Sequence, residues 1–172
     1  MKNLLFTFLI FIFGVVCATD NSVNYDNYML KLVQMAKESN PTYPFAAMII
    51  DNKTGKILCT GVNNVGANHN PMLHGEMDAI NECVIKYGKK MNWSTSTLLT
   101  TAEPCPMCMS AIIWAGISKV VYGTSIKYLS EHKWKQIEIG FEEVAKRASF
   151  QKVTIVGGIM ESQTNPLFIH ST

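Results

Sequence analysis

Two short stretches of the chain carry residue types that suit metal chemistry. The first is His74-Gly75-Glu76, and the second is Pro104-Cys105-Pro106-Met107-Cys108. One imidazole and two thiolates are ligands that zinc takes in a catalytic site, where the fourth position is kept for water. Glu76 lies two residues after His74, close enough to reach that water without being a ligand. The pattern predicts one zinc ion per chain held by His74, Cys105 and Cys108, with Glu76 moving protons.

The spacing of the cysteines also predicts where they lie. Residues at i and i+3 on a helix face the same side, so Cys105 and Cys108 suit the first turn of one helix. The N-terminal end of a helix favours a thiolate over a thiol. Two alternative roles of this cysteine pair are open. A redox disulfide within C-x-x-C needs no metal, and a purely structural zinc site needs a fourth protein ligand.

H-x-E followed by P-C-x-x-C is the pattern of zinc deaminases that act on nucleobases. Over residues 43–123 the sequence resembles the cytidine deaminase superfamily, in the branch with guanine deaminases, tRNA adenosine deaminases and fungal cytosine deaminases. The resemblance implies hydrolytic deamination with water as co-substrate. Zinc lowers the pKa of a bound water to roughly 7. Glu76 would then carry a proton from this water to the ring nitrogen and next to the departing amine. An exposed acidic residue in a first helical turn is the alternative for Glu76.

The elements that position these residues follow from hydrophobic periodicity. Helical spacing predicts helices over 25–39, 74–87, 105–115, 126–136 and 141–147. Apolar and β-branched runs predict strands over 45–50, 56–62, 95–101, 118–122 and 153–156. Strands that alternate with helices indicate a mixed sheet covered on both faces. We therefore expect an α/β fold, a three-layer α/β/α sandwich with a mixed five-stranded sheet, as the resemblance also implies.

The resemblance implies further residues around the substrate. Asn63 stands at the end of the second strand, where tRNA adenosine deaminases have a substrate-binding Asn. Its amide would read the edge of the base, although a turn-forming role is open and Asn64 is an alternative for either role. Ala47 is a small residue that would let the strand backbone approach the base, and Phe45 would form a wall of the pocket.

Glu103 and Trp114 complete this set of substrate-binding candidates. Glu103 precedes Pro104 as in guanine and tRNA adenosine deaminases, and we expect its backbone carbonyl, rather than its side chain, to meet the leaving ammonia. Trp114 resembles a Trp of guanine deaminases, and simple core packing is an equal alternative. The Glu103–Cys108 string favours a purine such as guanine or guanosine. Cytosine and tRNA adenosine are the alternative substrates, and a structural-zinc binding module is the alternative without catalysis.

The N-terminus has the layout of a secretory signal peptide. A short basic start precedes an apolar run over residues 4–16, and small residues up to Ala18 precede a polar stretch. The apolar run is too short to span a bilayer. We favour cleavage after Ala18 over lipidation at Cys17, because Val16 is bulky. The expected organisation is a signal peptide over 1–18 and a single catalytic domain over 19–172, secreted or periplasmic, without stable membrane association after cleavage.

The net charge limits the expected classes of partner, and the cysteine content raises the question of disulfides. The formal net charge of +2 does not favour nucleic acid, and the densest basic patch, Lys133-Trp134-Lys135, is interpreted as a solvated face. The expected partner is a small nucleobase or nucleoside, and the resemblance implies a homodimer. Cys59 and Cys83 could pair in an oxidising compartment. Since one lies in a predicted strand and the other on a predicted helix, we expect buried free thiols.

Overall fold

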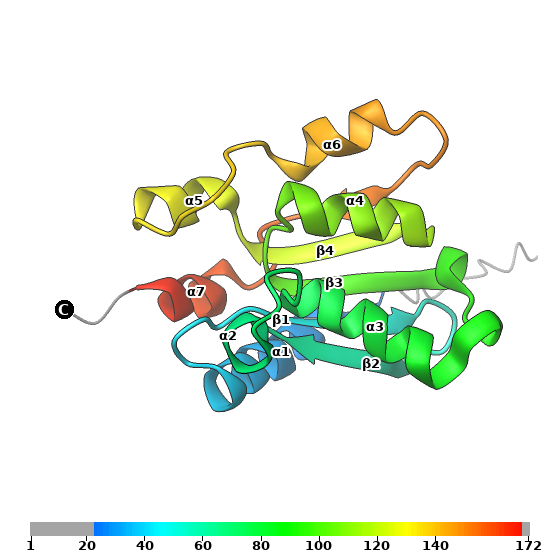
Figure 1. The fold of residues 1–172 in the computed structure, drawn as a ribbon, viewed down its shortest axis with the longest axis horizontal. Coiled ribbons are helices and arrows are strands. Elements are labelled where there is room, and N and C mark those ends of the chain that lie inside the picture. Colours follow the sequence, from blue (N-terminus) through cyan, green and yellow to red (C-terminus); the bar gives the residue numbers. More distant parts are fainter. Residues whose placement is uncertain (1–22, 170–172) are drawn as a thin grey trace, which may run out of the picture.

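A five-stranded sheet forms the middle layer of the computed structural model, which describes residues 23–169 (Figure 1). The strand order is β2-β1-β3-β4-β5. Strand β1 is antiparallel to β2 and β3, whereas β3, β4 and β5 run parallel. The bounds are Ala46–Asp51 for β1, Ile57–Val62 for β2, Ser96–Ala102 for β3, Lys119–Thr124 for β4 and Thr154–Val156 for β5. The predicted mixed five-stranded sheet is confirmed.

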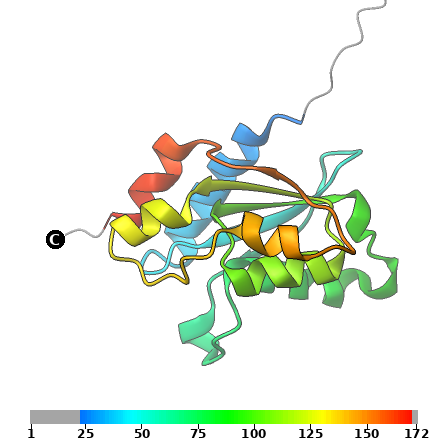
Figure 2. The ribbon, with the colours of Figure 1, turned by 90° about the horizontal axis from the view of Figure 1, so that it is seen from above.

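Helices cover both faces of the sheet, which makes three layers (Figure 2). One face carries α3 (Gly75–Tyr87), α4 (Pro106–Ala115) and α6 (Phe141–Arg147), and the other carries α1 (Tyr25–Ser39) and α7 (Glu161–Thr164). The shorter elements are α2 (Val65–Asn68), α5 (Ile126–Glu131) and the 3-10 turns η1 (Gly88–Lys90), η2 (Trp93–Thr95) and η3 (Asn165–Phe168). Within residues 23–169, no helix is long and apolar enough to cross a membrane.

Alternation along β1 divides the core between these layers. Successive side chains of a strand point to opposite faces of its sheet. Ala47 and Ile49 therefore pack with the residues of α3 and α4, whereas Met48 and Ile50 pack with those of α1. All four side chains are buried, which explains why this stretch of the sequence is apolar at every position. Strand β1 therefore packs against both helical layers, and the start of α3 lies against its first residue, Ala46.

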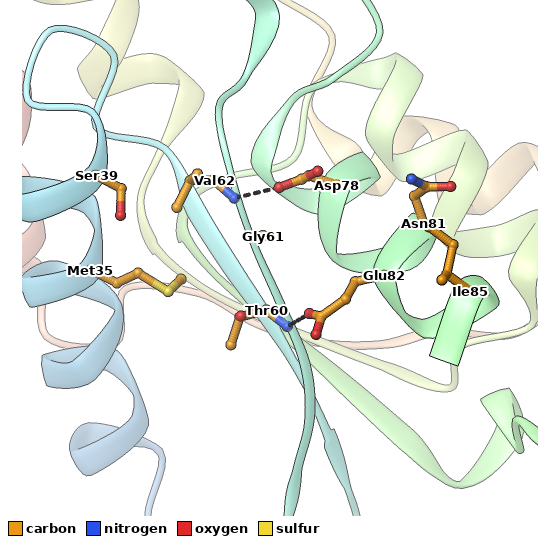
Figure 3. A pocket seen from close by; sticks show the side chains of 9 residues that line it. All are labelled: Met35, Ser39, Thr60, Gly61, Val62, Asp78, Asn81, Glu82 and Ile85. Atoms are coloured by element: carbon orange, nitrogen blue, oxygen red, sulfur yellow. Dashed lines mark hydrogen bonds between the residues drawn. The ribbon is translucent and has the colours of Figure 1, made fainter. Parts of the chain in front are cut away.

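Helix α3 packs very closely on the edge strand β2. A Cβ atom at Gly61 would overlap the backbone nitrogen of Ala79 and the carbonyl oxygen of Gly75, so no larger residue fits there. Asp78 accepts a hydrogen bond from the backbone N–H of Val62 at 3.1 Å, and Glu82 accepts one from that of Thr60 (Figure 3). These contacts satisfy N–H groups that an edge strand would otherwise expose.

The same edge carries a disulfide between Cys59 on β2 and Cys83 on α3, with the Cα atoms 5.5 Å apart. Our expectation of free thiols is therefore wrong. Both cysteines are buried in the core between the sheet and α3. The physical reason is the close approach at Gly61, which brings a strand residue and a helix residue within bonding distance. A shallow pocket of 440 Å³ lies on the outer side of this contact, between Met35 of α1 and Ile85 of α3 (Figure 3).

The largest departure from the predicted elements lies in the segment after β4. The helix predicted over 126–136 ends at Glu131. Lys133 takes a left-handed conformation with φ of 66°, and the N–H of Trp134 turns back to the carbonyl of Leu129 at 3.0 Å. This arrangement terminates a helix by satisfying its last carbonyls. The predicted helices over 25–39 and 141–147 are confirmed. The predicted signal peptide lies outside the described residues.

Candidate active site

The starts of α3 and α4 bring the predicted metal ligands together. His74 and Cys105 occupy the cap positions of α3 and α4, both with extended backbone, and Pro106 begins α4. Proline suits the first helical position because its fixed φ matches the helix and its missing N–H needs no partner there. Gly75 lies against β1, where an added Cβ would lie 3.0 Å from the carbonyl oxygen of Phe45. A larger residue at position 75 would displace the start of α3.

The three side chains have the spacing of a metal site. Nδ1 of His74 lies 3.7 Å from Sγ of Cys105 and 3.6 Å from Sγ of Cys108. The three ligand atoms all lie within 4.8 Å of one another. In a tetrahedral zinc site, the usual bond lengths place nitrogen and sulfur ligand atoms about 3.6 Å apart and two sulfurs about 3.8 Å apart. The donor set and its geometry therefore fit a zinc ion.

The thiols and the imidazole form one hydrogen-bonded group. The Cys108 thiol donates to Cys105, which lowers the pKa of Cys105 to about 4 and raises the pKa of Cys108. Burial raises the pKa of Cys108 further. The hydrogen bond with Cys105 raises the pKa of His74 against the opposing effect of burial. The lowered pKa of Cys105 favours its thiolate, which is the form that binds metal.

Glu76 lies in the first turn of α3 beside this group. Only 5% of the residue is exposed, although a carboxylate in a first helical turn is usually at the surface. Burial raises the pKa of Glu76 to about 7, because the charged form loses its hydration. The alternative of an exposed helix residue is thereby excluded. Glu76 lines a pocket together with His74 and Cys105, so its carboxyl group is accessible to a small molecule.

This pocket has a volume of 900 Å³, within the range of small-molecule sites. Its floor is the group of His74, Glu76 and Cys105. Segments 41–45, 63–71, 133–137 and 167–169 contribute its walls. One wall is aromatic: the ring of Phe45 lies 5.4 Å from that of Trp134, at an interplanar angle of 85°. Flat apolar surfaces of this kind are suited to hold a planar ring.

Asn63 lines the pocket, and its side chain has a different partner from that of Asn64. Oδ1 of Asn63 accepts a hydrogen bond from the N–H of Val65 at 3.3 Å. Within residues 23–169, Nδ2 of Asn63 donates to no protein group, so this amide is available to a ligand. Nδ2 of Asn64 instead donates to Asp78 at 3.0 Å. Asn64 therefore attaches the loop to α3, and Asn63 faces the pocket.

The other predicted substrate-binding residues divide into two groups. Phe45 and Glu103 line the pocket. Ala47 and Trp114 are not brought there. Ala47 is the second residue of β1 and is buried between the sheet and the helices. Trp114 does not line this pocket: it is 77% exposed on α4 and contacts Phe150, with ring centroids 4.8 Å apart.

Several pocket residues escaped the sequence analysis. Lys133 and Lys135, interpreted as a solvated face, line the pocket and flank Trp134. The patch is exposed, as expected, but it lies at the mouth of the site. Tyr43 and Met107 also contribute to the lining. The helical spacing over 126–136 masked the irregular loop at 132–140, and only the basic and aromatic composition of this loop could have signalled a binding role.

Comparisons with known proteins agree with this geometry. Residues 22–124 match the family model described as the cytidine and deoxycytidylate deaminase zinc-binding region. The tRNA-specific adenosine deaminase of Rickettsia bellii is 31% identical over 130 residues, which cover 76% of this chain and 85% of that protein. Guanine deaminase of Bacillus subtilis is 32% identical over 124 residues, 70% of this chain and 73% of that protein. The solved structure of guanine deaminase from Nitrosomonas europaea superposes with a TM-score of 0.67 at 22% identity, over 83% and 80% of the two chains.

The chain belongs to the cytidine and deoxycytidylate deaminase family. The protein is a hydrolytic deaminase of the nucleobase and nucleoside class. The names of its relatives refer to different substrates, guanine in one case and tRNA adenosine in another. Membership therefore establishes the class of reaction, whereas the substrate depends on the walls of this particular pocket.

Proposed function

We propose that this protein hydrolytically deaminates a free purine base or nucleoside, such as guanine or guanosine, and releases ammonia. The observation that carries this proposal is the placement of Glu76, buried, beside a His74–Cys105–Cys108 group on the floor of one pocket. The three side chains would hold one zinc ion per chain. When bound, zinc would supply Lewis-acid activation of the attacking water.

The remaining chemistry is assigned to the protein's own residues. Glu76 would accept a proton from the attacking water and deliver protons to the ring nitrogen and the leaving amine. The Asn63 amide would hydrogen-bond the edge of the base. Phe45 and Trp134 would hold the ring by its faces and edges and exclude water from it. The pocket of 900 Å³ leaves room for a two-ring base and a sugar.

Two observations favour a second candidate, adenosine within tRNA. One is the similarity to the tRNA-specific adenosine deaminase of Rickettsia bellii. The other is the position of Lys133 and Lys135 at the pocket, since ammonium groups there suit phosphates of a nucleic acid backbone. The net charge of +2 and the predicted export both favour the small-molecule substrate. Cytosine is the third substrate to be tested.

The test is ammonia release by the zinc-loaded protein on guanine, guanosine, adenosine, adenine, cytosine, cytidine and an anticodon stem-loop RNA. We expect turnover of one purine base or nucleoside. Glu76→Gln should reduce kcat by about 10²- to 10⁴-fold and retain zinc. Glu138→Gln, an equal change at an exposed position, should leave kcat unchanged. Full activity of Glu76→Gln would refute the proton-transfer role, and turnover of the RNA alone would replace the substrate proposal.

We further propose that the chain is exported and cleaved after Ala18. The Cys59–Cys83 disulfide supports export, since structural disulfides persist mainly in oxidising compartments. Expression with the native N-terminus in a Gram-negative host tests this, with the intact mass measured in each fraction. An uncleaved mass confined to the cytoplasm would refute the proposal. The homodimer implied by the family stays a prediction, and analytical ultracentrifugation would decide it.

A further inference from the structure

One side chain connects both ends of a wall of the pocket to the sheet. Oε2 of Glu103 accepts a hydrogen bond from the N–H of Ile126 at 2.7 Å, and Oε1 accepts one from the N–H of Phe141 at 3.2 Å. Ile126 is the first residue of α5, and Phe141 is the first residue of α6 (yellow and orange in Figure 1). Hydrogen bonds to an ionised acceptor are stronger than those between neutral groups. The carboxylate therefore fastens a sixteen-residue segment, 126–141, at both of its ends.

Glu103 is itself held on rigid structure. Its backbone N–H donates to the carbonyl of Thr124 at 2.7 Å, which extends the pairing of β3 with β4. Two residues later the chain reaches Cys105, the cap of α4. A Cβ atom at Gly140 would lie 3.4 Å from Oε1 of Glu103, so the segment passes close to the carboxylate. Glu103 therefore lies next to the start of α4 along the chain, and its carboxylate holds the 126–141 segment beside it.

The middle of this segment forms the pocket wall. Residues 133–137 line the pocket, and residues 132–140 contain no helix or strand. The indole N–H of Trp134 donates to the carbonyl of Phe168 at 2.7 Å, which joins this wall to the C-terminal turn. Leu129 and Phe141 are buried on either side. Because the wall lacks a regular hydrogen-bonded ladder, side-chain contacts hold it in position, and the two hydrogen bonds of Glu103 are those at its ends.

We propose that the Glu103 carboxylate is a positioning residue that holds the 126–141 segment in place as a wall of the pocket and thereby sets the affinity for substrate. The effect on substrate rests on the proposed deaminase function, whereas the attachment itself does not. The role predicted for Glu103 belongs to its backbone carbonyl, and the carboxylate adds a separate one. Both oxygens already accept protein N–H groups, so the side chain acts on the substrate through the wall.

The test compares Glu103→Gln with the wild type in the absence of substrate, by hydrogen exchange read out by mass spectrometry. The Gln oxygen can accept from one N–H, but its NH2 group opposes the other. Amides of residues 126–141 should exchange about tenfold faster, because one end of the segment is released. Exchange in α1 and β1 should not change. Glu138→Gln, which removes an exposed carboxylate within the same segment, should leave exchange unaltered.

Steady-state kinetics on the member of the panel that the wild type deaminates complete the test. For Glu103→Gln we expect KM to rise about tenfold and kcat to stay within about twofold, since Glu76 and the metal ligands keep their places. A rise in KM with unchanged exchange in the free protein would show direct substrate contact and overturn the proposal. A lower Tm with unchanged KM and unchanged exchange would show a merely structural role and also overturn it.

The experiment also gives an answer if the wild type is inactive or if the variant does not fold. If the wild type deaminates no member of the panel, the proposed function fails, and the exchange data still decide whether Glu103 holds the segment. If Glu103→Gln does not fold, Glu103→Asp takes its place, because it keeps the charge but is one methylene too short to reach both N–H groups. Unchanged exchange in Glu103→Asp would overturn the proposal.

Discussion

Reduction of the Cys59–Cys83 disulfide should lower the stability of the protein by a predictable amount. The cysteines are 24 residues apart in sequence, and both are buried. In the chain-entropy treatment, a loop of this length removes about 12 cal/mol/K from the unfolded chain, which is about 3.5 kcal/mol at 25 °C. With a urea m value of ~2 kcal/mol/M, the midpoint of unfolding should fall by roughly 1.7 M. This would be a large part of the stability of a typical domain.

The assay is urea unfolding followed by tryptophan fluorescence, with and without a phosphine reductant and with zinc in excess throughout. Alkylation and mass spectrometry of the unfolded protein establish the state of each thiol. The matched control is the Cys59→Ala/Cys83→Ala double variant, whose midpoint should not respond to reductant. An equal response in this control would assign the effect to Cys105 and Cys108. An unchanged midpoint of verified, reduced wild type would refute the entropic reasoning.

Two other predictions concern carboxylates at the sheet edge and at the β1–β2 turn. Asp78→Ala should lower the free energy of unfolding by about 1–3 kcal/mol, measured by urea unfolding, because Oδ2 of Asp78 accepts from both Val62 and Asn64. Loss of less than a few tenths of a kcal/mol would contradict this account of α3. The Thr54 hydroxyl, followed by the Thr54 N–H, lowers the pKa of Asp51 from its ordinary value of 3.8. A carboxylate with a lowered native pKa stabilises the fold above its unfolded pKa and loses this effect as pH falls through its native pKa. The difference in unfolding free energy between wild type and Asp51→Asn should therefore be present at neutral pH and vanish in acid. A difference that does not depend on pH would exclude the titration of Asp51 as its cause.

Local patterns were enough to find the core of the candidate site. His74, Cys105 and Cys108 are recognisable because ligand type and spacing within one turn are properties of a few neighbouring residues. The strongest elements, such as the helix over 25–39, follow from periodic burial along a single stretch. The helix predicted over 126–136 ends at Glu131, and Trp134 instead donates its indole N–H to the carbonyl of Phe168 in the distant C-terminal turn.

Side-chain direction limited the remaining predictions. Ala47 and Phe45 are two residues apart, yet one lies in the core and the other in the pocket, because β1 begins between them at the rim. Trp114 shares α4 with Cys108, but it projects from the exposed face of that helix. The choice between these outcomes requires the strand register and the helix orientation, which no short stretch of sequence contains.

The sequence by itself determined the reaction class, the candidate site of His74, Glu76, Cys105 and Cys108, and the five strands with the longer helices, since each depends on local residue type and period. Only the tertiary structure decided the Cys59–Cys83 disulfide, the placement of Lys133 and Lys135 at the pocket, and the two hydrogen bonds of Glu103. These features join residues that are far apart in the chain. Their distances are set by how closely the layers pack, and that packing is a property of the whole fold.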